Sequence, residues 1–423
     1  MKVAVVGAGI IGVTTAYELA VDGHEVTVFE RCSAAAEETS FANAGVVSPG
    51  SVTPWAAPGM PGKVLRNLLS RHAAVKLSLP LSGGDLAWMW KWWRACKLET
   101  YLANRSRLLR LAFYSRERLH HLTAELQLDY DRAEGYTVLL RSEKDSALVQ
   151  PGLKILRDAG VAFSEINAEA TRLIEPAINP DTQFLGSIHL PNDEVANCRQ
   201  FAMLLKDVAR HLGVNFEFNT TVASINTAQA ASILIAGETQ ARQFDQIVMC
   251  AGLASAALLK PLGLRIPMTA VYGYSISAPI REPLNAPRSA LMDERYKVAI
   301  SRLGNRVRVA GSAEIGGTLS SNRASSVQTL YKVLHDWFPG AAKHTHSNTN
   351  TGASVQLWKG ARPMLPDGPP LIGNSGVPGL WLNLGHGSSG WALSCGSARI
   401  LADLMSGQSA AIDIEGLGVS RLG

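Results

Sequence analysis

Cysteine is scarce in this 423-residue sequence, and long hydrophobic runs are absent. The five cysteines form an odd set without a CxxC pair, which argues against a disulfide framework or a zinc site and favours a reducing compartment. No stretch approaches 18 uninterrupted apolar residues, so we expect no membrane-spanning helix. These absences predict a cytoplasmic protein without a structural metal.

An excess of charge of one sign is also lacking. The 40 Lys and Arg residues against 35 Asp and Glu residues leave a net charge of +5, and no block of like charge occurs. This balance is too mild and too dispersed to indicate nucleic-acid binding. A hydrophobic fraction of 47% over this length predicts a globular enzyme, with two domains or one large domain carrying an insertion.

The first thirty residues carry the most informative pattern, which is a strand, a glycine-rich turn, a helix and a second strand ending in Glu30. Gly7 permits a tight turn, Gly9 lets the backbone approach a pyrophosphate, and Gly12 lets the helix pack close to the strand. The helix N-terminus offers N–H groups to phosphates, and Glu30 is placed to accept hydrogen bonds from a ribose. We interpret this N-terminal unit as part of the fold rather than as a signal peptide. It predicts a dinucleotide site but leaves FAD and NAD open.

The rest of the chain changes from an α/β pattern to a period of two. Residues 198–218 predict a helix and a strand beside the first two, and residues 244–252 predict a buried strand that ends at Gly252 and opens a helix. Between 267 and 314 the period predicts an antiparallel sheet that cannot belong to a Rossmann repeat. A last strand at 380–384 leads through a glycine-rich turn into a helix. Further expected elements are helical segments at 84–128, 147–159 and 328–338 and a strand at 137–141.

Several motifs together resemble the D-amino acid oxidase superfamily: the N-terminal fingerprint with Glu30, SFANAG at 40–45, WKGARPMLPDG at 358–368 and NLGHG at 383–387. Within it, PWAAPG at 54–59 and LPNDE at 190–194 resemble the bacterial D-amino acid dehydrogenases, in particular the family of their small subunits. The resemblance runs in register over nearly the whole chain. One departure is Ser388-Ser389, where those dehydrogenases usually show Thr-Leu, and it bears on the shape of the pocket near the flavin.

The resemblance implies FAD as cofactor, an α/β fold with a Rossmann-type FAD-binding domain of the GR2 class, and an inserted substrate domain built on an antiparallel sheet plus helices. We assign residues 1–84, 190–266 and 355–423 to the FAD-binding domain, and residues 85–189 and 267–354 to the substrate domain. The implied reaction is oxidative deamination of a D-amino acid to a 2-oxo acid and ammonia, by hydride transfer from Cα to flavin N5. Electrons pass to a quinone-type respiratory acceptor.

Two arginines are candidates for binding the substrate carboxylate, because a guanidinium fork suits a carboxylate. Arg362 occupies the position of the superfamily's carboxylate-binding arginine, in an expected Pro/Gly turn, and Arg302 is the alternative if it is not in a structural ion pair. Tyr274 and Tyr296 either line the substrate pocket and donate a hydroxyl or pack in the sheet. His386 is expected to line the cofactor site rather than act as a base, since a neutral amine can lose hydride directly.

Small residues at 43–45 are expected to pass close to the flavin ring, and N–H groups at 385–390 to stabilise the charge of reduced flavin. Arg31 either reaches the adenylate phosphates or is solvated. The predicted cofactor-binding residues are Gly7, Gly9, Ile10, Ile11, Gly12, Glu30, Arg31, Ser40, Asn43, Ala44, Gly45, Val222, Gly252, Gly360, Gly385, His386, Gly387, Ser388 and Gly390.

A tryptophan cluster at 88–93 allows two interpretations. Trp88, Trp92 and Met89 share a helical face near Lys91 and Arg94, as in a helix lying on the inner face of the cell membrane. Core packing of the same face is the alternative. The quinone use that the resemblance implies supports the membrane interpretation, but core packing of the helix is the slightly favoured one.

Three other functions stay open at this point. One is an oxygen-using amine oxidase of the glycine or sarcosine type. A second is a flavin-binding subunit that assembles a larger complex, and the third is an NAD-dependent dehydrogenase.

Overall fold

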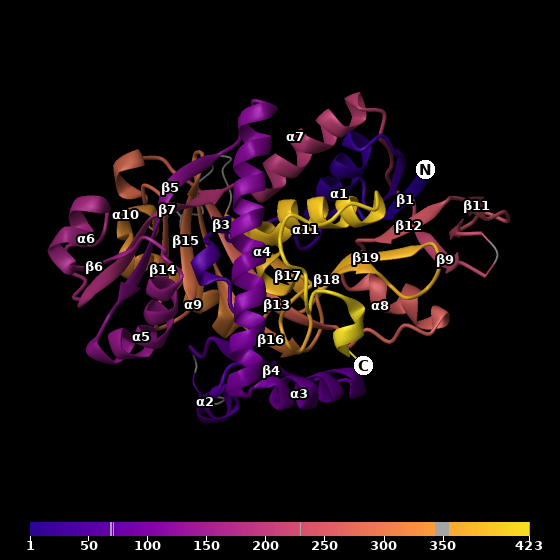
Figure 1. The fold of residues 1–423 in the computed structure, drawn as a ribbon. Helices are drawn as coiled ribbons and strands as arrows, with labels where there is room; N and C mark the ends of the chain where they lie inside the picture. Colours follow the sequence, from indigo (N-terminus) through magenta and orange to yellow (C-terminus); the bar gives the residue numbers. More distant parts are fainter. Residues whose placement is uncertain (68–69, 71, 229, 343–354, 423) are drawn as a thin grey trace.

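The computed structural model describes residues 1–67, 70, 72–228, 230–342 and 355–422, and two large β-sheets organise it (Figure 1). The first is a six-stranded sheet in the order β18 (Leu371–Asn374), β19 (Leu380–Leu384), β12 (Gln246–Met249), β1 (Lys2–Val6), β2 (Glu25–Phe29) and β8 (Asn215–Glu217). Its strands run parallel except β18. This confirms the predicted α/β fold, in which β12 and β8 flank the N-terminal pair.

The second sheet has ten strands and is mainly antiparallel. Its main order is β17 (Gln356–Met364), β13 (Thr269–Pro279), β16 (Arg306–Gly316), β15 (Val298–Leu303), β14 (Ala290–Asp293), β5 (Arg132–Leu140), β7 (Gly186–Ala196) and β3 (Val46–Val47), with β4 (Val75–Ser78) on β16 and β6 (Ser164–Asn167) on β7. A small third sheet contains β11 (Arg242–Gln243), β10 (Ser232–Ile235) and β9 (Val222–Asn226).

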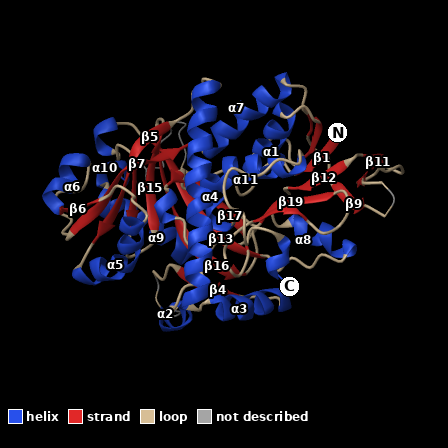
Figure 2. Ribbon diagram, in the orientation of Figure 1, coloured by secondary structure: helices blue, strands red, loops and turns tan. Residues whose placement is uncertain are grey.

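Helices cover both sheets, and the long α4 stands between them (Figures 1 and 2). The α-helices are α1 (Ile10–Val21), α2 (Met60–Asn67), α3 (Gly83–Ala95), α4 (Leu98–Glu125), α5 (Glu143–Asp158), α6 (Ala168–Ile174), α7 (Cys198–His211), α8 (Ala254–Leu259), α9 (Ala324–Trp337), α10 (Pro339–Ala342) and α11 (Gly390–Met405). Within the described ranges, no helix is both long enough and apolar enough to cross a bilayer.

Two parts of the predicted organisation need correction. Residues 356–364 form β17 rather than a Pro/Gly turn, because β17 is an edge strand and tolerates its proline. In addition, β3, β4, β17 and residues 190–196 of β7 belong to segments that we assigned to the FAD-binding domain, yet they pair in the ten-stranded sheet. The predicted division therefore splits the strands of this sheet between the two domains, and its boundary at 190 falls inside β7. Residues 343–354 of the predicted substrate domain lie outside the described residues.

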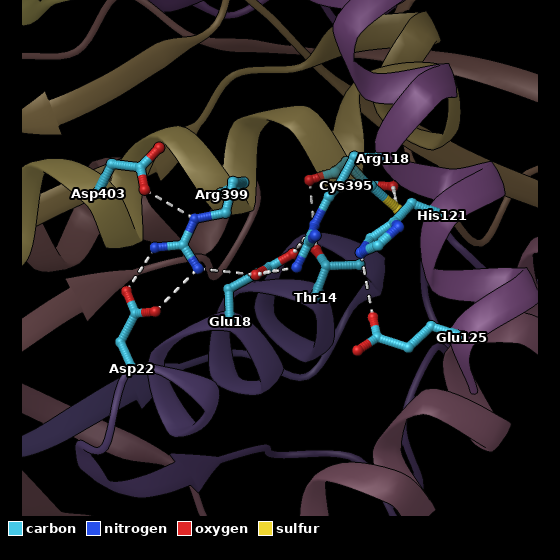
Figure 3. A network of polar contacts seen from close by, with 10 residues as sticks. Thr14, Glu18, Asp22, Arg118, His121, Glu125, Cys395, Arg399 and Asp403 are labelled. Atoms are coloured by element: carbon cyan, nitrogen blue, oxygen red, sulfur yellow. Dashed lines mark hydrogen bonds and ion pairs between the residues drawn. The ribbon is translucent and has the colours of Figure 1, made fainter. Parts of the chain in front are cut away.

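A buried carboxylate joins the three helices α1, α4 and α11 (Figure 3). Glu18 on α1 is fully buried and accepts hydrogen bonds from Arg118 Nε on α4 at 2.7 Å and from Arg399 Nη1 on α11 at 3.0 Å. Arg399 also pairs with Asp22 and Asp403. Because an uncompensated buried charge is costly, this network depends on each partner.

Replacing Glu18 with glutamine is expected to lower the free energy of unfolding by about 3 kcal/mol, since Arg118 then lacks its counter-ion. Urea denaturation followed by circular dichroism measures the change. The control is Glu125→Gln in the exposed His121–Glu125 pair, which should cost less than about 0.5 kcal/mol. Equal losses in both variants would show that the buried network contributes no special stability.

Candidate functional site

A cavity of about 1830 Å³ is lined by residues from both large sheets. It exceeds the roughly 300–1,000 Å³ of most small-ligand sites, so it has room for a dinucleotide together with a substrate. Of the predicted site residues, all line this cavity except Gly12 and Arg302. The structure thus brings together residues from the two ends and the middle of the chain.

The glycines of the fingerprint shape one end of the cavity. Gly7 has a φ of +101°, and a Cβ there would lie 2.8 Å from the carbonyl oxygen of Cys250. A Cβ on Gly12 would lie 1.8 Å from the carbonyl oxygen of Gly7, so this close approach requires glycine. Gly12 does not itself line the cavity, but it allows the turn that does. Gly9 lines the cavity, and its Cβ would meet only Ser40 Oγ at 3.5 Å. The open side of Gly9 leaves the start of α1 accessible to a phosphate.

Two polar side chains hold this end in shape. Glu30 accepts hydrogen bonds from the Ala8 N–H at 2.7 Å and the Cys32 N–H at 2.8 Å, one on each carboxylate oxygen. Each oxygen keeps a further lone pair for a ribose hydroxyl. Ser40 Oγ accepts a hydrogen bond from the Ile10 N–H at 3.0 Å. Arg31 lines the cavity, but its guanidinium is paired with Glu38.

The turn before α11 shapes the middle of the cavity. Gly385 has a φ of +79°, and a Cβ on it would lie 2.5 Å from Leu365. His386 pairs with Met364 in an isolated β-bridge, which places the end of β17 against this turn. Burial lowers the pKa of His386 to about 3, so the ring is neutral at physiological pH. Its Nε2 lies 2.9 Å from Ser397 Oγ.

Three residues of the cavity wall carry a buried polar atom that has no hydrogen-bond partner in the described part of the chain. The atoms are Asn383 Oδ1, Trp391 Nε1 and, on the third residue, Arg105 Nε. Buried polar groups are almost always paired, so unpartnered polar atoms in the wall of a cavity are consistent with a polar ligand. Together with the glycine cradle and Glu30, they fit the dinucleotide FAD.

Arg362 extends from β17 into the cavity. Its Nη1 donates to the Ser312 carbonyl at 2.9 Å, and no described carboxylate lies within ion-pair distance of it. Burial lowers the pKa of Arg362 to about 10, which still leaves it charged at neutral pH. A cavity-facing cation without a counter-ion is suited to bind an anionic substrate.

Two neighbours of Arg362 escaped the sequence analysis. A Cβ on Gly273 would lie 2.3 Å from Arg362 Nη2, so the guanidinium occupies the space above this glycine. Ser312, whose carbonyl accepts from Arg362, has a φ of +62°. An isolated glycine inside a strand pattern marks a close approach, and Gly273 carried that signal.

The structure separates the two tyrosine candidates. The Tyr274 hydroxyl donates to Glu314 and accepts from the Arg323 N–H at 3.0 Å, so it is engaged inside the protein. Tyr274 is 1% exposed and packs in the core against α9, although it also contributes to the cavity wall. Tyr296 is partly exposed, lines the cavity and contacts His72 edge-to-face. Of these two tyrosines, Tyr296 is the better candidate to donate its hydroxyl to a substrate.

Arg302 lies away from this cavity, in a smaller recess of about 440 Å³. Its Nη1 donates to the Pro283 carbonyl at 3.4 Å. Arg362 is therefore the arginine that the geometry favours for the carboxylate. No group of three or more His, Cys, Asp or Glu residues in the described ranges is arranged to hold a metal ion.

The profile of the DAO family, described as FAD dependent oxidoreductase, matches residues 2–404. A protein named D-amino acid dehydrogenase from Bradyrhizobium diazoefficiens is 41% identical over all of this chain and 99% of its own length. A second of the same name from Allorhizobium ampelinum is 40% identical over all of this chain and 98% of its own length.

Solved structures share the fold. Glycine oxidase from Geobacillus kaustophilus superposes with a TM-score of 0.76 at 20% identity, covering 99% of this chain and 98% of its own. L-proline dehydrogenase from P. horikoshii gives a TM-score of 0.75 at 15% identity, covering 100% of this chain and 97% of its own.

Proposed function

This chain belongs to the DAO family of FAD-dependent oxidoreductases, with FAD as its cofactor, and we propose that it oxidises D-amino acids to 2-oxo acids and ammonia. The observation that carries the proposal is the charged guanidinium of Arg362, which lines the cavity near the turn before α11 and has no counter-ion among the described residues. The names of its full-length relatives support the D-amino acid as substrate.

The proposed reaction gives a role to each part of the cavity wall. When bound, FAD supplies the oxidising chemistry by taking up a hydride from the substrate Cα. Arg362 would hold the substrate carboxylate, and the N–H groups at the start of α11 would stabilise negative charge on the reduced cofactor. His386 is neutral and lines the site. The substrate enters as the free amine, so that no side-chain base is required.

Product analysis tests the proposed reaction. The purified holoenzyme, given an artificial electron acceptor without oxygen, should convert D-alanine to pyruvate and ammonia in equal amounts. L-alanine should give neither product. A protein that binds FAD but releases no ammonia from any D-amino acid would fit a flavin-binding subunit of a larger complex instead.

We further propose a quinone-type electron acceptor for the reduced enzyme. Its test is stopped-flow reoxidation of the reduced protein by oxygen and by a water-soluble quinone analogue. Faster reoxidation by the quinone supports a dehydrogenase. Faster reoxidation by oxygen supports an amine oxidase of the glycine or sarcosine type.

The tryptophan helix α3 has two aromatic faces. Trp88 is 3% exposed, donates from Nε1 to the Met364 carbonyl at 2.8 Å, and stacks on Trp92, so the face that we considered for membrane contact packs in the core. Trp90 and Trp93 on the other face are 55% and 54% exposed, and their rings pack against each other.

This second face suits peripheral contact with a membrane. Lys91, Arg94 and Lys97 are exposed around it, and α3 lies at one edge of the molecule beside α2 (Figure 1). Exposed tryptophans among basic residues are typical of surfaces that bind anionic lipid. We propose that Trp90 and Trp93 anchor the protein at the inner face of the cell membrane, close to the quinone pool.

The double variant Trp90→Ser/Trp93→Ser is expected to bind phosphatidylglycerol vesicles at least about tenfold more weakly, because two interfacial anchors are lost. Co-sedimentation with vesicles measures the binding. The control variant Leu284→Ser removes an even more exposed apolar side chain from another part of the surface and should bind normally. If the double variant sediments like the unmodified protein, α3 is not the contact.

A further inference from the structure

The cavity-lining segment Ala42–Gly45 has all four carbonyl groups bound by the ten-stranded sheet. Ser275 Oγ donates to the first carbonyl at 2.9 Å, Arg308 Nη1 to the second at 3.1 Å, and Ser301 Oγ to the third at 2.7 Å. The Ala196 N–H donates to the fourth at 2.8 Å. The negative ends of these peptide dipoles therefore point into the sheet.

Arg308 is the charged member of this set. It is paired across the sheet with Ser277 on β13 and Ser301 on β15, and its Nε donates to Ser277 Oγ at 2.9 Å. It is not among the described residues that line the cavity, although Asn43, whose carbonyl it holds, does line it. Its guanidinium thus lies one backbone layer behind the cavity wall.

No described carboxylate lies within ion-pair distance of Arg308. Its electrostatic surroundings include Arg306 and Arg199, which repel it, and Asp131, which favours its charge. Burial lowers the pKa of Arg308 to about 10, so it remains charged at neutral pH. A buried cation without a paired anion is costly to a fold and is typical of functional sites.

We propose that Arg308 is a positioning residue that places a positive charge behind Ala42–Gly45 and thereby stabilises the negatively charged reduced form of FAD bound in the cavity. The hydrogen bond to Asn43 fixes where the charge sits, and the low dielectric of the protein interior lets it act across one backbone layer. This role concerns the cofactor and does not depend on which amino acid the enzyme oxidises.

The test compares the FAD-loaded variants Arg308→Gln, which is neutral but still able to donate a hydrogen bond, and Arg308→Lys, which keeps the charge. The glutamine variant is expected to lower the equilibrium constant for two-electron reduction of bound FAD about tenfold, equal to about 30 mV in midpoint potential. Its dissociation constant for sulfite, an anion that adds to flavins, should rise about tenfold. The lysine variant should stay within about threefold of the unmodified protein in both measurements.

Ser301→Ala is the matched control, because it removes the neighbouring bond to Ala44 but keeps Arg308. It should leave the midpoint potential unchanged. Equal potentials in the glutamine and lysine variants would overturn the proposal, as would a shift in Ser301→Ala as large as that of Arg308→Gln. If the glutamine variant fails to hold FAD while the lysine variant holds it, the charge is again implicated, whereas equal loss in both counts against it.

Discussion

Replacing Arg362 with methionine is expected to lower kcat/KM for D-alanine roughly a thousandfold while FAD stays bound. The estimate rests on the 2–5 kcal/mol that truncating one partner of a buried charge pair costs. Arg362→Lys should recover only part of the loss, because the lysine ammonium keeps the charge but not the planar fork. Anaerobic steady-state kinetics with an artificial acceptor measure both variants, and the visible spectrum reports the bound flavin.

Arg302→Met is the matched control, since Arg302 occupies a separate recess and donates to a backbone carbonyl. Its kinetic constants should equal those of the unmodified enzyme. If Arg362→Met retains kcat/KM within threefold, the carboxylate is bound elsewhere and the proposed substrate pose fails.

Replacing Gly12 and replacing Gly9 of the fingerprint should have different effects on stability and on FAD binding. Gly12→Ala is expected to yield protein with less than about a tenth of the normal FAD content and lower stability, because its Cβ would overlap the Gly7 carbonyl. Gly9→Ala should fold normally, since its Cβ meets only Ser40 Oγ at 3.5 Å, yet bind FAD at least about tenfold more weakly. The ratio of flavin to protein absorbance and thermal unfolding separate the two effects.

Gly62→Ala serves as the control for both, because a Cβ there meets nothing within 4 Å and the residue lies on α2. It should keep FAD and stability. Full FAD content in Gly9→Ala would mean that the start of α1 does not face the pyrophosphate.

The N-terminal unit was predictable because its signals are local. An apolar run, a glycine-rich turn and an acidic strand end lie within thirty residues, and the structure confirms β1, α1 and β2 there. The period of two across β13, β15 and β16 was equally clear. Each of these patterns follows from which side of its own element is buried.

Arg362 shows where local signals mislead. Gly360 and Pro363 are typical of turns, but β17 is an edge strand, where a proline can be accommodated, and Gly360 leaves room for the ring of Trp358. The resemblance identified the arginine, whereas the strand that carries it depends on pairing with β13, some ninety residues earlier.

The remaining differences come from partners distant in sequence. Tyr274 lies on the predicted strand, but its hydroxyl is taken by Glu314, and no spacing rule connects the two. Which face of α3 packs inward depends on the Met364 carbonyl, which accepts a hydrogen bond from Trp88. No sequence pattern indicated a role for Arg308, since its proposed role depends on a segment that precedes it by more than 260 residues.

Anaerobic mixing of the FAD-loaded protein with D-alanine and with L-alanine tests the central claim most directly. The account predicts that the D-isomer bleaches the visible absorbance of the bound flavin in one turnover, that the L-isomer leaves it unchanged, and that Arg362→Met slows the bleaching. A flavin that no D-amino acid bleaches, or that both isomers bleach alike, would contradict it.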